Sequence, residues 1–407
     1  MLWSSSAGQI SWNSFRKPVS ERAAEVRRQP METARATTTR NVPWYKDAVS
    51  AYDRWVEAQG VPIHEGYHVP DLRTLELGPW PDRGCSAAFL KLAGQEGVSE
   101  VRVSEIAPGQ TVAPLKFGFD ELVYVVDGRG LATVWKETGG PSTTFEWQTH
   151  SMFLIPRHHP HQISNAQGQR PARLLHYNYL PFVMDAIPDA PFYFDNGYVG
   201  PSGDAGQLTD LYSEAKEVAR NGPDGGTRTG WTGNFFPDML AWDKLSSGDR
   251  RGFASSLVGM RFPNSSVTSH LAVFPPFTYK KAHRHGPGVI VIILAGEGFS
   301  VMWPEGGDKE FLSWQAGSAF VPPNRWWHQH FNVGAEPARY LALHSAPSIL
   351  GYGENVEDLA RDQIEYTDED PLVRETFETE LARRGLKSEL PEEVYRQRDF
   401  QSALASS

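Results

Sequence analysis

The sequence repeats itself at long range, and this repetition restricts the possible folds more than any other feature of the chain. Three pairs of segments correspond: Gly128-Arg129-Gly130 with Gly296-Glu297-Gly298, Pro156–Asn165 with Pro323–Asn332, and Pro171-Ala172-Arg173 with Pro337-Ala338-Arg339. The offset stays between 166 and 168 residues in all three pairs. A repeat with so constant an offset predicts two domains of the same fold in one chain.

The composition and one apolar run indicate β-structure. The 407 residues include 37 glycines and 30 prolines, which favour a turn-rich β fold over a helical one. In the second copy, Val289–Leu294 is an apolar run too short for a typical helix, and Gly296-Glu297-Gly298 follows it. We interpret the run as a buried strand that ends in a glycine turn. The predicted fold class is therefore all-β.

Histidines lie on both sides of this strand in the sequence. His283 and His285 are two residues apart, so on a strand their side chains point the same way and Arg284 points away. A hairpin-rich fold can return His328 beside them. A single histidine is usually a packing residue, but three imidazoles that meet inside a barrel form a site for a first-row transition metal. We therefore predict His283, His285 and His328 as metal ligands.

The stretch from His283 to Asn332 resembles the two sequence motifs of the cupin superfamily. The first motif is H-x-H followed by a Glu, an apolar strand and a G-x-G turn, and this chain has Val289 where the Glu would stand. The second motif corresponds to Gly317–Asn332, with Arg325 in place of its second glycine. The resemblance implies a bicupin, which consists of two jelly-roll β-barrels with peripheral helices.

Because the Glu is missing, the second copy looks like the three-histidine branch of the superfamily. That branch includes gentisate 1,2-dioxygenase and related ring-cleaving bicupins, which are non-haem iron enzymes. Those relatives keep their metal in the first barrel, whereas this chain has its histidine set in the second copy.

The ligand set also predicts the chemistry. Three neutral imidazoles suit Fe, Cu, Ni and Zn, and they leave a divalent ion with its full charge and two or three open positions. An anionic bidentate substrate and dioxygen fill such positions in a non-haem Fe(II) dioxygenase. We therefore expect Fe(II), with Mn, Ni, Zn and Cu as alternatives, and an enzyme that cleaves or oxidises a small aromatic or enolic substrate. Two alternatives are a Ni, Mn or Zn cupin acting as isomerase, lyase or decarboxylase, and a non-catalytic ligand-binding bicupin.

The first copy lacks most of these ligands. The repeat places Leu115 and Phe117 at the positions of the first two histidines, while Glu121 and His161 remain at the Glu position and the third histidine position. Two ligands are too few for a stable site. We expect the first barrel to have a structural or substrate-gating role.

Further candidate residues surround the predicted ligands. His330 lies two residues past His328 and is a candidate fourth ligand, proton donor or packing residue. Trp327 directly precedes the ligand and is a candidate pocket wall, and Arg325 is a candidate anchor for a substrate carboxylate. We take His330, Arg325 and Trp327 as candidate catalytic residues. Weaker candidates are two histidines and four cations: His270, His344, Arg261, Lys280, Lys281 and Arg339.

Composition divides the chain into six segments. They are a basic leader (1–40) that we expect to be disordered, an aromatic N-terminal arm (41–98), the first barrel (99–182), a connecting segment (183–252), the second barrel (253–348) and an acidic helical tail (349–407). Apolar spacing with start and stop residues predicts helices over 47–59, 208–220 and 371–384.

Charge and cysteine content exclude several classes of function. The net charge of −10 argues against a nucleic-acid or acidic-membrane partner, and no apolar run approaches membrane-spanning length. Cys85 is the one cysteine, which excludes an internal disulfide framework and fits a reducing cytoplasm. The expected partners are a small-molecule substrate, dioxygen and further copies of the chain in a homo-oligomer.

Overall fold

The long-range repeat of the sequence is also a repeat of strand order. The computed structural model describes residues 49–198, 208–221, 227–345, 360–398 and 400, so the predicted disordered leader lies outside the described residues. All elements below belong to the unit that begins at Ser50.

The first barrel consists of a large and a small sheet. The large sheet has the order β1 (Ile63–Gly66), β4 (Cys85–Leu92), β5 (Glu100–Ile106), β11 (Ala172–Asn178), β6 (Glu121–Asp127), β9 (Met152–Ile155), β14 (Phe235–Phe236), and β3 (Gly78–Trp80) also pairs with β4. The small sheet has the order β10 (His161–Asn165), β7 (Arg129–Trp135), β8 (Ser142–Gln148).

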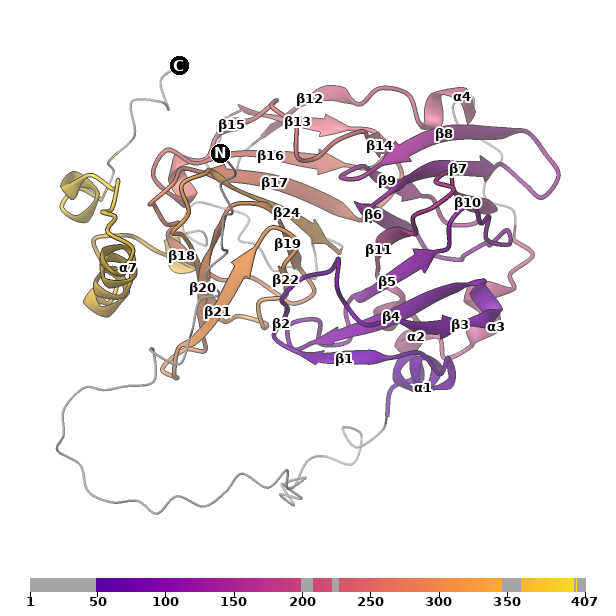
Figure 1. The fold of residues 1–407 in the computed structure, drawn as a ribbon, viewed down its shortest axis with the longest axis horizontal. Helices are drawn as coiled ribbons and strands as arrows, with labels where there is room; N and C mark the ends of the chain where they lie inside the picture. Colours follow the sequence, from indigo (N-terminus) through magenta and orange to yellow (C-terminus); the bar gives the residue numbers. More distant parts are fainter. Residues whose placement is uncertain (1–48, 199–207, 222–226, 346–359, 399, 401–407) are drawn as a thin grey trace, which may run out of the picture. The chain divides into compact units, whose positions relative to one another are not determined.

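The second barrel has the same plan. Its large sheet has the order β12 (Lys216–Asn221), β13 (Thr227–Thr232), β16 (Ser256–Arg261), β17 (Thr268–Phe274), β24 (Ala338–His344), β19 (Ile290–Ala295), β22 (Ala319–Phe320), β2 (His68–Val69), and β15 (Ser246–Ser247) also pairs with β16. Its small sheet has the order β21 (Glu310–Gln315), β20 (Glu297–Trp303), β23 (Trp327–Asn332), β18 (Ala282–His283), β25 (Gln363–Ile364). The strand order β4-β5-β11-β6-β9 of the first barrel thus recurs as β16-β17-β24-β19-β22, which confirms the predicted all-β fold of two jelly-roll barrels (Figure 1).

Strand alternation separates three apolar cores. On β6, Leu122 and Tyr124 pack into a core that both large sheets share, whereas Val123 and Val125 point into the first barrel. On β19 and the residue before it, Ile290 joins the shared core and Val289 points into the second barrel. A side chain on these strands therefore faces either the neighbouring barrel or the interior of its own barrel.

The repeat extends to the segment before each barrel, which we call its arm: the N-terminal arm for the first barrel and the connecting segment for the second. A strand of each arm pairs with the other barrel. β2 comes from the N-terminal arm but pairs with β22 of the second barrel, and β14 comes from the connecting segment but pairs with β9 of the first. β1 and β13 each run parallel to the first long strand of their own barrel. Much of the 183–252 segment is thus the second copy of the arm, and its prediction as a separate connection missed this correspondence.

One predicted helix in that segment is wrong. The spacing over 208–220 predicts a helix, but the structure has only the short α4 (Leu208–Leu211), and the chain from Lys216 onward is the strand β12. β12 pairs with β13 over its whole length. Backbone pairing along a sheet edge here overrides a local helical pattern, which is a weak determinant of structure on its own.

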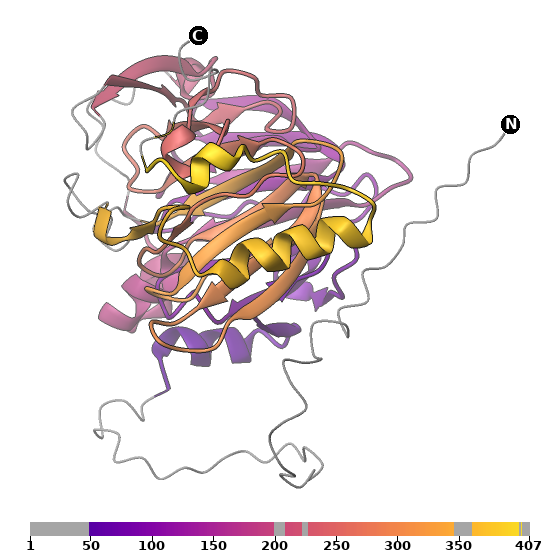
Figure 2. The ribbon, with the colours of Figure 1, turned by 90° about the vertical axis from the view of Figure 1, so that its left-hand side faces the viewer.

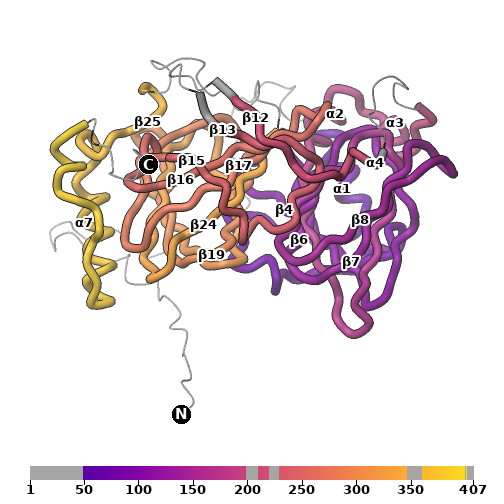
Figure 3. The backbone as a smooth tube through the Cα atoms, turned by 90° about the horizontal axis from the view of Figure 1, so that it is seen from above, coloured from indigo at the N-terminus to yellow at the C-terminus, as the bar shows by residue number. Residues whose placement is uncertain are grey.

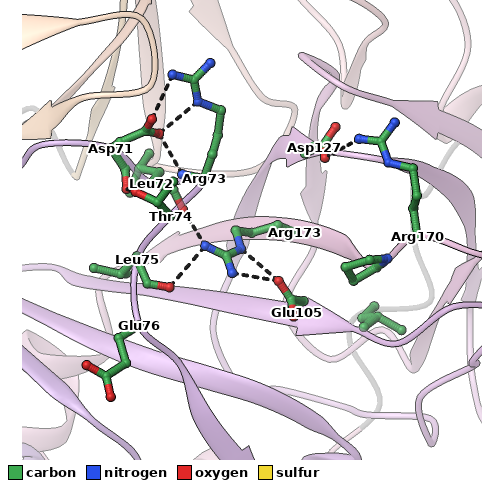
Figure 4. Close-up of polar contacts among 12 residues, drawn as sticks. Asp71, Leu72, Arg73, Thr74, Leu75, Glu76, Glu105, Asp127, Arg170 and Arg173 are labelled. Atoms are coloured by element: carbon green, nitrogen blue, oxygen red, sulfur yellow. Dashed lines mark hydrogen bonds and ion pairs between the residues drawn. The ribbon is translucent and has the colours of Figure 1, made fainter.

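Two arginines of the repeated Pro-Ala-Arg motif hold the exchanged arms. Arg173 Nη1 donates to the carbonyls of Leu72 (2.9 Å) and Leu75 (3.1 Å), and its guanidinium also binds Glu105 (Figure 4). Arg339 Nη1 donates in the same way to the carbonyl of Trp242 at 2.7 Å. The motif therefore has a structural role in both halves, and Arg339 is not placed to anchor a substrate.

Helices lie at the periphery, as the fold prediction states. They are α1 (Ala51–Ala58), α2 (Leu180–Ala186), α3 (Ala190–Phe194), α7 (Pro371–Arg383) and the 3-10 turns η3 (Pro81–Arg83), η4 (Asp249–Arg251) and η5 (Glu392–Tyr395). The Asp370 side chain caps α7, as expected for a helix with proline in its first turn. α7 lies across the small sheet of the second barrel, on the side away from the first barrel (Figures 2 and 3), and Phe377 contacts Tyr279 and Phe331 there. No helix among the described residues is long and apolar enough to cross a membrane.

Candidate metal centre

The three predicted ligands come together on two neighbouring strands of the second barrel. His283 ends β18 and lies directly opposite His328 of β23 in the antiparallel register. His285 follows in the next loop, where the backbone N–H of Arg325 donates to its carbonyl at 2.8 Å. One candidate ligand atom from each of the three histidines lies within 4.8 Å of the others. The strand alternation inferred from the sequence thus brings the three imidazoles together.

Backbone carbonyls hold each ring in the orientation that a metal requires. Nδ1 of His283 faces the carbonyl of Lys281 at 3.4 Å, and Nδ1 of His328 faces that of Trp326 at 3.1 Å. Nδ1 of His285 donates to the carbonyl of Gly286 at 2.7 Å. A carbonyl only accepts, so Nδ1 carries the proton and Nε2 keeps its lone pair for a metal ion.

Burial keeps these imidazoles neutral. It lowers the pKa of His283 and of His328 well below 6.5, and that of His285 to about 4. The charge of Arg251 lowers all three pKa values further. Neutral imidazole is the form that binds metal, so the site needs little deprotonation near neutral pH.

His330 shares the interior face of β23 with His328 but lies outside the three-histidine cluster. Its ring centroid is 5.8 Å from that of His328, and its Nδ1 is 2.8 Å from Ser300 Oγ. Burial lowers its pKa to about 3. The geometry therefore places His330 beside the ligands, and its predicted catalytic role stays a prediction.

The other two candidate catalytic residues bind acidic side chains. Trp327 lies on the face of β23 opposite to His328, and its indole N–H donates to Glu305 at 3.0 Å. The Arg325 guanidinium binds the Asp362 carboxylate through both Nη atoms. The charge of Arg325 nevertheless acts on His285, and the predicted catalytic roles of both residues stay predictions.

Arg325 stands where the cupin motif has a glycine, and its backbone keeps the conformation that favours glycine. Its φ is 61°, in the left-handed region where glycine is favoured and where the motif has a glycine. The corresponding residue of the first barrel, His158, has a φ of 64°. Both barrels therefore need the same turn, and both form it with a residue that is not glycine.

A buried lysine, one of the predicted anchors, lies among aromatic rings of the same barrel. Lys280 is 2% exposed, its Nζ lies over the rings of Phe274 and Tyr340, and its backbone N–H donates to His330. Among the described residues, no acceptor lies within hydrogen-bonding distance of Nζ. Burial lowers the pKa of Lys280 to about 7, and the charge of Arg251 acts in the same direction.

The remaining predicted candidates have other surroundings. Lys281 forms an ion pair with Glu365 at 2.6 Å, and Arg261 is exposed at the end of β16. His270 and His344 bind each other, with Nδ1 and Nε2 2.9 Å apart.

Sequence reasoning missed Arg251. It ends η4 and its guanidinium donates to Gln363 at 3.1 Å, while its charge reaches the three ligands. A signal was available, because Arg83-Gly84 recurs as Arg251-Gly252 at the repeat offset of 168.

The first barrel has an ion network where the second has its histidines. Leu115 pairs with His161 as His283 pairs with His328, which agrees with the predicted equivalence of these positions. Arg102 binds both Glu100 and Glu121, and His176 Nδ1 lies 2.9 Å from Glu121. Among the described residues, the three histidines of the second barrel form the one cluster suited to a metal ion.

Comparisons with known proteins give partial matches. No family model matches the chain. Glucose-6-phosphate isomerase from Pyrococcus furiosus is 29% identical over 84 residues, which cover 20% of this chain and 44% of that protein, so the match spans less than half of the relative.

Similar solved structures include variants of Bacillus subtilis oxalate decarboxylase. One has a TM-score of 0.44 and 15% identity, covering 69% of this chain and 77% of the other. A structure of that enzyme described for its Mn(II) centres has a TM-score of 0.45 and 14% identity, covering 83% and 87%.

Proposed function

We propose that the second barrel is the catalytic centre of a metal-dependent enzyme that acts on a small anionic substrate. The observation that carries this proposal is the buried cluster of His283, His285 and His328, with each Nδ1 directed at a backbone carbonyl. A divalent ion held by the three Nε2 atoms supplies positive charge and open coordination positions for substrate oxygens. Fe(II), Mn, Ni, Zn and Cu are all compatible with three imidazoles.

The cations of the barrel favour an anionic substrate. Lys280 has no partner among the described acceptors, and Arg251 adds a further positive charge that acts on the ligands. Among the residues that the structure describes, no carboxylate side chain belongs to the histidine cluster. The aromatic rings of Phe274, Phe320 and Tyr340 in the interior core restrict the substrate to a small molecule.

We propose a redox-neutral reaction that includes a proton transfer, such as isomerisation, decarboxylation or another lyase step. Lys280 supports this class because its pKa of about 7 allows the amine to donate or accept a proton near neutral pH. The partial match to an isomerase is compatible with the same class.

A second candidate is the Fe(II) dioxygenase suggested by the gentisate-like resemblance. The observation that favours it is Val289, which is 1% exposed and points into the barrel at the position where the cupin motif has a Glu. A site without an anionic protein ligand has room for both a chelating substrate and dioxygen. The relatives named above are an isomerase and a decarboxylase, so they add no specific support for this candidate.

Metal analysis and an activity panel distinguish the candidates. Protein purified without oxygen should contain about one equivalent of metal, and the His283→Ala, His285→Ala double variant should contain none. The metal-loaded protein is then offered small hydroxy, keto and dihydroxyaromatic acids with and without dioxygen. Turnover that continues without dioxygen and is lost in Lys280→Met supports the redox-neutral reaction. Turnover that requires stoichiometric oxygen uptake supports the dioxygenase, and metal retained by the double variant contradicts both.

A further inference from the structure

The first barrel encloses a cavity that the metal centre does not use. Its volume is about 50 Å³, and it lies between the ion network and the aromatic residues near η3. Most of its lining is apolar, and its polar lining includes Arg83, Cys85 and His161. A cavity of this volume holds roughly four water-sized positions, which is room for a small organic molecule.

The deep charged groups of this cavity bind one another. The Arg102 guanidinium binds two carboxylates, those of Glu100 and Glu121. Burial alone would raise the pKa of Glu121, but the charges of Arg102 and His176 hold it well below its usual range. Burial lowers the pKa of His176, so this network of one guanidinium and two carboxylates keeps a surplus negative charge and offers no site for a further anion.

Arg83 differs from these groups because no described carboxylate lies within hydrogen-bonding distance of it, although the charges of Glu121 and Glu100 act on it. Its guanidinium carbon lies 5.2 Å from the ring centroids of Phe117 and Phe194 and 5.4 Å from that of Trp80. No acceptor among the described residues is within hydrogen-bonding distance of it. A guanidinium between aromatic rings, with its donors unused, presents the planar fork that binds a carboxylate.

The internal repeat supports the same interpretation. Arg83 ends η3 and Arg251 ends η4. Each is followed by a glycine and lies shortly before the first long strand of its barrel. The charge of Arg251 acts on the metal ligands, so this position directs positive charge to the barrel interior. His161 keeps the ring orientation of a ligand, because its Nδ1 faces the carbonyl of His159.

We propose that the first barrel binds a small carboxylate, with the carboxylate group on Arg83 and an apolar body against the surrounding rings. The binding site is separate from the metal centre and does not depend on the reaction assigned to it. The cavity volume suits a ligand of about four or five non-hydrogen atoms, such as propanoate, and part of a larger acid such as benzoate would lie beyond the enclosed volume at the Arg83 end.

Calorimetry on the full-length, metal-loaded protein tests the chemistry. Propanoate and benzoate are compared with propanamide and benzamide, which have similar shapes but no charge. We expect the carboxylates to bind at least tenfold more tightly than the amides, and Arg83→Gln to weaken carboxylate binding about ten- to a hundredfold. Arg170→Gln is the matched control, because Arg170 is an exposed arginine of the same barrel that pairs with Asp127. Equal binding of acids and amides, or unchanged binding in Arg83→Gln, overturns the proposal.

The single cysteine locates the bound molecule. Cys85 lines the cavity and is half-buried, and burial raises the pKa of its thiol to about 11, so thiol reagents should modify it slowly. Saturating benzoate should slow this modification several-fold, whereas benzamide should not.

Two further variants separate the alternatives. The His283→Ala, His285→Ala double variant should bind benzoate normally, and loss of binding there would assign the ligand to the metal centre and overturn the proposal. If Arg83→Gln does not fold, Arg83→Lys keeps the charge but not the fork and should bind benzoate more weakly. Whichever variant is used, the proposal is contradicted if benzoate does not slow the modification of Cys85 in the parent protein.

Discussion

Replacement of Lys280 by methionine should make the protein more stable. Lys280 is 2% exposed and has aromatic rings rather than a carboxylate around its Nζ. In the unfolded chain its pKa is near 10.5, and in the folded protein burial lowers it to about 7. Between these values the unfolded chain binds a proton that the folded protein does not bind.

The sign and size of the effect follow from this difference. From pH 7 to pH 10.5 the stability contribution of Lys280 rises by about 1.4 kcal/mol per pH unit. Relative to a neutral side chain, the full penalty of roughly 4 to 5 kcal/mol is therefore present at and below pH 7 and is relieved as the pH approaches 10.5. A bound metal ion adds positive charge to the barrel, which can only enlarge the penalty.

Methionine fills a similar volume and makes favourable contacts with Phe274 and Tyr340. After imperfect repacking, we expect Lys280→Met to raise the free energy of unfolding by about 2 to 4 kcal/mol at pH 7. Urea unfolding followed by tryptophan fluorescence measures this, and the gain should shrink as the pH rises from 7 to 9.5. Turnover should fall in the same variant, since stabilising a functional site commonly lowers activity.

Lys281 provides the matched control. It is the next residue along the chain, but it forms an ion pair with Glu365 at 2.6 Å. Lys281→Met should leave stability unchanged or reduce it. If Lys280→Met is no more stable than the parent at pH 7, or if its gain does not change with pH, then Lys280 is not a buried, unpartnered amine and its proposed role in proton transfer loses its basis.

Three further predictions concern the ligands, the Glu position and the exchanged arm. Metal content should be close to one equivalent per chain and should vanish in His283→Ala, His285→Ala, as elemental analysis will show; two equivalents would contradict the assignment to one barrel. Val289→Glu should keep or tighten metal binding but weaken substrate binding by about tenfold or more, because the new carboxylate competes with an anionic substrate; full activity of soluble, metal-loaded variant would refute this. Arg173→Met should lower the free energy of unfolding by about 2 to 4 kcal/mol, because two carbonyls and a carboxylate lose their partner. Arg170→Met should change it by no more than about 0.5 kcal/mol, and urea unfolding measures both variants.

Local patterns predicted the features that depend on local geometry. The cluster of three histidines follows from strand alternation and the repeat, and α7 follows from Pro371 and the apolar spacing after it. The helix expected over 208–220 does not form as predicted, because the segment from Lys216 onward pairs with β13 and no local pattern predicts that pairing.

The sequence by itself determined the two-barrel architecture and the cluster of three histidines. The repeat predicts two copies of one fold, and residues two apart on a strand, such as His283 and His285, point to the same side. Only the tertiary structure decided the partners of the cations near the histidines. Arg284 lies between two of the histidines in sequence and Arg325 lies three residues before the third, but both bind Asp362. Lys280 instead lies over rings of the barrel interior, and the charge of Arg251 acts on the histidines. The physical reason is that the pKa and the partners of a charged side chain depend on residues distant in the sequence, and these become neighbours only when the strands pair.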